Sequence, residues 1–136
     1  MVDLSASARA LVASGKGILA ADESNGTADK RLTAYGIPSG TEMRRKYRDL
    51  YLSAPGIEEF LSGVILYSET LEQKNDEGVS FADALSTRGI VPGIKVDEGT
   101  EPIPESPDEL ITKGLLGLSD RLHAYRDAHK IGFTKW

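Results

Sequence analysis

The sequence predicts an α/β fold whose strands run parallel. Four short apolar runs alternate with segments of helical spacing, and this order favours parallel strands joined by crossovers. Two architectures fit the pattern, an open doubly wound sheet and a closed (β/α)8 TIM barrel. A barrel needs about 250 residues, so this chain would supply roughly half of one, about its first four β/α units.

The elements follow from local patterns along the chain. Short apolar runs bounded by polar or turn residues predict strands at residues 18–21, 63–67, 90–96 and 133–136. Helical spacing and caps predict helices at residues 4–12, 27–35, 41–53, 69–73, 80–85 and 118–129. Residues 100–108 contain three prolines and are expected to form a loop.

Two of these expectations concern how the elements begin and pack. Thr27 is expected to be the N-cap of its helix. In the helix at 41–53, the spacing predicts one apolar face, made of Met43, Tyr47, Leu50 and Tyr51. The run at 18–21 is expected to be a strand buried on both faces.

Composition narrows the classes of function. The net charge of −5 argues against nucleic acid as a partner, since phosphate neutralisation needs a basic surface. The chain has no cysteine, and no apolar stretch reaches the length of a membrane span. His123 and His129 lie six residues apart, on roughly opposite faces of a helix, so we expect no metal site. We expect a cytoplasmic protein that binds no membrane.

Single charges stand at the ends of three predicted strands. Asp22 follows the first strand, Lys95 lies near the end of the third and Lys135 lies in the fourth. Because the carboxyl ends of parallel strands meet at one edge, these groups are expected to converge on one cleft. A carboxylate between two lysines can move protons, attack a carbonyl or hold a phosphate. Taken singly, each residue also fits a structural role, as a cap or as a lysine that reaches solvent.

A second feature is the segment 24–27 at a predicted helix start. Ser24 and Thr27 place two hydroxyls where free N–H groups and the helix dipole favour phosphate. Lys30 and Arg31 follow within one turn. By itself the pattern is better explained by ordinary helix capping and a solvated basic pair.

Several segments resemble class I fructose-bisphosphate aldolases, the metal-independent family that forms a Schiff base. The first is residues 15–24, Gly-Lys-Gly-Ile-Leu-Ala-Ala-Asp-Glu-Ser. Four further segments match in the same order, at residues 30–32, 63–71, 93–97 and 133–136. The run of matches extends from about Leu11 to Trp136 and is more specific than any one motif.

The resemblance implies a TIM barrel that reversibly cleaves fructose 1,6-bisphosphate to dihydroxyacetone phosphate and glyceraldehyde 3-phosphate, in glycolysis and gluconeogenesis, without a cofactor. It implies catalytic roles for Asp22, in proton transfer, and for Lys135, in carbinolamine and Schiff-base chemistry. It implies substrate binding near the C6 phosphate by Lys95, Ser24, Thr27 and Arg31. From spacing alone, Lys95 would have been the candidate for the Schiff-base lysine, but the resemblance places that lysine on a later strand.

The resemblance also identifies residues 1–136 as the N-terminal half of a single barrel domain, which in the full-length enzyme is a tetramer. Thr27, Thr134 and Glu98 depart from the family's usual Ser, Ala and Lys. The family's Schiff-base lysine, acid/base glutamates and C1-phosphate site lie beyond Trp136, so this fragment is expected to be inactive alone. The alternative is a non-catalytic half-barrel that binds phosphate or a partner.

Overall fold

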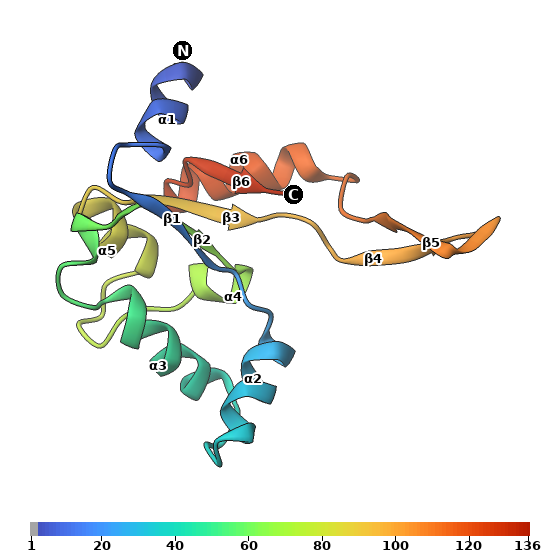
Figure 1. Ribbon diagram of the computed structural model, residues 1–136, viewed down its shortest axis with the longest axis horizontal. Coiled ribbons are helices and arrows are strands. Elements are labelled where there is room, and N and C mark those ends of the chain that lie inside the picture. Colours follow the sequence, from blue (N-terminus) through green and yellow to red (C-terminus); the bar gives the residue numbers. More distant parts are fainter. Residues whose placement is uncertain (1–2) are drawn as a thin grey trace.

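The computed structural model describes residues 3–136 and contains one parallel sheet, one antiparallel ribbon and a set of helices (Figure 1). The strands of the parallel sheet are β1 (Gly17–Ala21), β2 (Leu61–Leu66), β3 (Val91–Lys95) and β6 (Phe133–Lys135). The helices are α1 (Leu4–Leu11), α2 (Asn25–Ala34), α3 (Thr41–Leu52), α4 (Ser68–Leu71), α5 (Phe81–Thr87) and α6 (Leu118–His129), with a 3-10 turn η1 at Ile57–Glu59. The predicted alternation of strands and helices is therefore confirmed.

The parallel sheet has the strand order β1-β2-β3-β6, so strands that follow one another in this set are neighbours. Each pair is parallel, as the crossover helices require. The register aligns Ala21 with Leu66, Leu66 with Ile94, and Ile94 with Thr134. The carboxyl ends of all four strands therefore lie at the same level, and the sheet is an open part of a barrel wall rather than a closed barrel.

The core lies between the sheet and the helices that cover one of its faces. Val64, Leu66 and Ile94 are fully buried on the strands. They pack with residues of the covering helices, among them Phe81 and Leu85 of α5. Since side chains alternate along a strand, the neighbours of these residues point to the opposite face. Lys95 and Lys135, which follow Ile94 and Thr134, therefore share the face opposite to this core.

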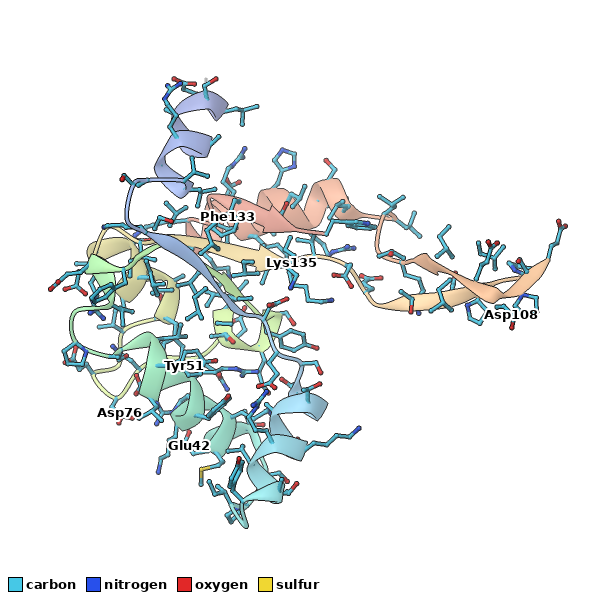
Figure 2. All side chains as sticks on the ribbon, in the orientation of Figure 1. Glu42, Tyr51, Asp76, Asp108, Phe133 and Lys135 are labelled. Atoms are coloured by element: carbon cyan, nitrogen blue, oxygen red, sulfur yellow. The ribbon has the colours of Figure 1, made fainter. Side chains whose placement is uncertain are left out.

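That second face carries glycines where an aromatic ring lies against the strands. A Cβ built on Gly93 would meet the Phe133 ring at 2.4 Å, and one on Gly63 would meet Leu11 at 2.8 Å and Phe133 at 3.1 Å. The absence of side chains at these two positions allows Phe133 of β6 and Leu11 of α1 to cover the sheet. Figure 2 labels Phe133 beside the strands.

The structure corrects the expected loop at residues 100–108. Here β4 (Thr100–Ile103) and β5 (Ser106–Thr112) pair antiparallel and form a ribbon that extends away from the parallel sheet (Figure 1). Proline is tolerated in edge strands, and both strands of a two-stranded ribbon are edges. The three prolines therefore did not exclude strand structure.

Two further expectations about burial were wrong. The strand β1 is an edge strand in which most residues are exposed or half-buried, so it is not buried on both faces. In α3 the buried residues are Arg44, Arg48, Asp49 and Leu52, while Leu50 is 76% exposed. The inner face of α3 is therefore largely charged, because carboxylates from other elements meet its arginines.

Candidate active site

The carboxylate of Asp22 and the ammonium of Lys135 form an ion pair across the carboxyl ends of the strands. Lys135 Nζ donates to Asp22 Oδ2 at 2.7 Å, although 113 residues separate the two in sequence. Asp22 directly follows β1 and its side chain is 9% exposed, whereas that of Lys135, labelled in Figure 2, is 43% exposed. The expectation that these two residues meet is confirmed.

Lys95 lies beside Lys135 in the register but has a different partner. The two lysines are aligned across β3 and β6. Lys95 Nζ donates to Asp97 Oδ1 at 2.5 Å and to the Asp97 backbone oxygen at 3.2 Å. This hydrogen bond holds the pKa of the Asp97 carboxyl below its usual range. The structure thus brings Asp22 and Lys135 into contact and aligns Lys95, bound to Asp97, with Lys135. The expectation of one shared cleft is not met, because Asp22 and Lys95 line two separate clefts and Lys135 lines neither of them.

The hydroxyls of Ser24 and Thr27 lie at the start of α2. Ser24, rather than Thr27, is the N-cap, since the Thr27 N–H donates to Ser24 Oγ at 3.3 Å. The two hydroxyl oxygens are 3.0 Å apart. Both residues are exposed, so the capping interaction leaves them accessible from solvent. The capping explanation accounts for their local geometry without excluding a ligand.

The guanidinium of Arg31, a residue of α2, is paired with the Glu23 carboxylate. Its Nε and Nη2 donate to Glu23 Oε1 at 3.1 and 2.9 Å. The Glu23 carboxylate raises the pKa of Arg31 above its usual value. Glu23 and Ser24 are adjacent, so the pair keeps the arginine close to the α2 N-terminus, with its side chain 57% exposed.

Two clefts open at this edge of the sheet and share Ser24. One, of about 430 Å³, is lined by Lys95, Asp97, Ser68 and Tyr67 as well as Ser24. The other, of about 500 Å³, is lined by Asp22, Ser24, Thr27 and Arg31, with Tyr47 and Tyr51 of α3. A larger cleft of about 900 Å³ lies between α3, the 75–79 turn and α5, and none of the predicted site residues lines it.

Sequence reasoning missed several residues that line the Lys95 cleft. Asp97 stands two positions after Lys95, and this spacing could have indicated an ion pair. Arg121 of α6 also reaches the cleft, where its Nη2 donates to the Gly114 oxygen at 2.6 Å and the Val96 oxygen at 3.3 Å. Arg121 also forms an ion pair with Glu98 at 3.2 Å. No local pattern marks Arg121, because the fold of the 96–117 segment brings these partners to α6.

Among residues 3–136, no group of three or more metal-ligating side chains lies close enough to hold a metal ion. Over the same residues, no helix combines the length and the apolar character needed to cross a membrane. The polar groups at the strand ends are carboxylates, ammonium groups, guanidinium groups and hydroxyls. Such a set can bind an anionic ligand and transfer protons next to it.

A family model described as fructose-bisphosphate aldolase class-I matches residues 3–136. The chain belongs to the class I fructose-bisphosphate aldolase family. It is 47% identical over 135 residues to a probable fructose-bisphosphate aldolase class 1 of Xanthomonas axonopodis pv. citri, covering 98% of the chain and 40% of the relative. It is 48% identical over 134 residues to fructose-bisphosphate aldolase 1 of Toxoplasma gondii, covering 98% of the chain and 37% of the relative.

The fold agrees with this aldolase family membership. A solved structure of Plasmodium falciparum fructose-bisphosphate aldolase, in complex with TRAP and a small-molecule inhibitor, matches with a TM-score of 0.92 and 45% identity. The match covers 98% of this aldolase-family chain and 38% of the solved one. The chain thus has the α/β fold of the corresponding part of an aldolase and spans about 40% of the length of its relatives.

Proposed function

We propose that this chain supplies one wall of the active site of a class I aldolase. In the full-length enzyme, that site reversibly cleaves fructose 1,6-bisphosphate to dihydroxyacetone phosphate and glyceraldehyde 3-phosphate. Residues 1–136 form the N-terminal half of a single TIM barrel domain. The observation that carries the proposal is the Asp22–Lys135 ion pair at the carboxyl ends of the strands, in a chain of this family.

The pair provides both partners for proton transfer. The Asp22 carboxylate accepts a proton from a substrate hydroxyl while the carbon–carbon bond breaks. The Lys135 ammonium donates a proton to the oxygen that leaves when a carbinolamine becomes a Schiff base. Their 2.7 Å contact keeps the buried acceptor and the more exposed donor together.

The remaining predicted residues would hold the substrate's C6 phosphate. Lys95 contributes a cation, and the α2 N-terminus contributes backbone N–H groups with the hydroxyls of Ser24 and Thr27. Arg31 adds positive charge near the same helix end. For this role the Lys95 ammonium must exchange its contact with the Asp97 carboxylate for one with the phosphate group. A phosphate group carries more negative charge than a carboxylate and offers more acceptor oxygens.

The Schiff-base lysine of the family is expected on a later strand, so residues 1–136 alone should not turn over substrate. The functional unit is proposed to be cytoplasmic and homo-oligomeric in the full-length enzyme. The lack of cysteine is compatible with a reducing compartment. Trapping the isolated chain with borohydride and dihydroxyacetone phosphate is expected to label no lysine.

The proposal can be tested in a full-length chimeric enzyme, called the completed chimera below. Residues 3–136 replace the matching segment of the Xanthomonas axonopodis relative, which is 47% identical to the chain, and cleavage of fructose 1,6-bisphosphate is assayed. Turnover comparable to the parent enzyme is expected. Asp22→Asn and Lys135→Met in this chimera should each lower kcat by about 10²-fold or more. A folded chimera that is inactive, or substituted chimeras of normal activity, would contradict the proposal.

The second candidate function is a non-catalytic half-barrel that binds phosphate or a partner. The sheet favours this function, because β1 and β6 are its two edge strands in the described part of the chain. An edge strand has unpaired N–H and C=O groups that can pair with another chain. Light scattering on the isolated chain separates the two candidates. A discrete dimer with cooperative unfolding supports the module, whereas aggregation supports the aldolase fragment.

A further inference from the structure

Three helices meet around a cluster of charged and amide side chains behind the α2 N-terminus. Arg44 and Arg48 come from α3, Glu69 comes from α4, and Asn25 is the first residue of α2. The side chains of Arg48, Arg44 and Glu69 are 2%, 10% and 18% exposed. Charges this buried need partners, so each contact in the cluster restrains the others.

Glu69 is the central residue of this cluster. Arg44 donates from Nε to Glu69 Oε2 at 2.9 Å and from Nη2 to Glu69 Oε1 at 2.6 Å. Arg48 Nη1 also donates to Oε2. Two guanidinium groups therefore hold both oxygens of this carboxylate, and a bidentate contact of this kind fixes orientation as well as position.

Asn25 connects the cluster to the α2 N-terminus. Its Nδ2 donates to Glu69 Oε1 at 3.1 Å, and its Oδ1 accepts from Arg48 Nη2 at 3.1 Å. Both polar ends of the amide are thus held by side chains that belong to other helices. Since Asn25 directly follows Ser24, this contact restrains the backbone that carries the Ser24 hydroxyl.

Glu69 is also next in sequence to a residue that lines the Lys95 cleft. Its neighbour Ser68 lines that cleft together with Ser24 and Lys95. The Glu69 carboxylate therefore restrains two segments that border this cleft. It restrains Ser68 through the α4 backbone and Ser24 through Asn25. A displacement of about 1 Å in such a wall can cost up to about 10²-fold in activity.

We infer that Glu69, acting through Asn25, is a positioning residue that holds Ser24 and Ser68 in place for the substrate's phosphate group. The inference rests on the proposed function and assigns Glu69 no contact with substrate. Its loss is expected to weaken binding of a phosphorylated sugar while the chemical step at Asp22 and Lys135 proceeds.

The test uses the completed chimera, in which KM and kcat for fructose 1,6-bisphosphate are measured separately. Asn25→Ala is expected to raise KM about 10-fold with kcat within about 3-fold, a change that corresponds to loss of binding alone. Inhibition by inorganic phosphate should weaken by a similar factor. Glu69→Gln should act in the same direction, and Asn25→Ala keeps the test decisive if the glutamate variant fails to fold.

Glu58→Gln is the matched control. Glu58 forms an ion pair with Arg88. It lies just before β2, at the amino end of the sheet, and neither residue lines the two clefts that share Ser24. This control should leave KM unchanged. If Asn25→Ala leaves KM unchanged, or lowers kcat instead, the inference fails while the proposed function stands. If the unsubstituted chimera is folded and inactive, the proposed function itself fails.

Discussion

Lys135 in the last strand reaches across the sheet to Asp22 after the first strand, and the two sides of this ion pair differ in exposure. Asp22 is 9% exposed and Lys135 is 43% exposed. Removing the lysine would leave a buried carboxylate without its partner, whereas a lysine without the carboxylate can turn to solvent. The two single substitutions should therefore have unequal costs.

We expect Lys135→Met to lower the free energy of unfolding by about 1–3 kcal/mol and Asp22→Asn to lower it by less. The double variant should recover part of the Lys135→Met loss, since no unpaired carboxylate remains. Urea denaturation of the three chimera variants measures these differences. Equal losses for the two single variants would show that burial does not decide the stability of this pair.

The Glu69 cluster predicts how stability depends on pH. Hydrogen bonds from Arg44, together with those from Arg48, lower the pKa of Glu69 from 4.5 to about 2, against the opposing effect of burial. A carboxyl whose folded pKa is depressed stabilises the fold above its unfolded pKa. That contribution is lost as the pH falls through the folded value.

The stability of the parent chimera should therefore fall between about pH 4.5 and pH 2 more steeply than that of the Glu69→Gln variant. Thermal unfolding followed over this pH range measures the difference. Glu105→Gln in the exposed turn of the β4–β5 ribbon is the control and should follow the parent. Parallel curves for the parent and Glu69→Gln would contradict the assignment.

The same cluster shows where sequence reasoning reaches its limit. The helix at 41–53 was predicted almost to the residue, because helical spacing is a local signal. Its buried face was predicted wrongly. The partners that allow Arg44 and Arg48 to be buried, Glu69 and Asp29, lie on other elements. No pattern within the helix reveals them.

For the candidate site, too, one part could be predicted from the sequence and another could not. The positions of Asp22, Lys95 and Lys135 at strand ends follow from local sequence and from the rule for parallel strands. The choice of partner follows only for Lys95, whose partner Asp97 stands two residues further along the chain. Lys135 pairs with Asp22 across 113 residues, and this contact is set by the tertiary arrangement of the strands.

The close contact between Gly93 and Phe133 predicts a cost for any side chain at residue 93. A Cβ there would lie 2.4–2.7 Å from three atoms of the ring, so the ring or the strand must move. We expect Gly93→Ala to lower the free energy of unfolding by about 1–3 kcal/mol. The loss should shrink when Phe133→Ala is present. Gly17→Ala is the matched strand control, since nothing lies within 4 Å of its Cβ position.

The end of α6 offers a substitution that should raise stability. In the described part of the chain, Lys130 is the one residue other than glycine with a positive φ, 56°, and it is the C-cap of the helix. A left-handed conformation costs a residue with a Cβ about 1–2 kcal/mol, and glycine avoids this cost. Lys130→Gly should therefore raise the melting temperature, even though it removes the exposed contact with Asp83. Lys130→Ala removes the same contact and keeps the strain, so it should lower the melting temperature; equal shifts for the two variants would contradict the backbone argument.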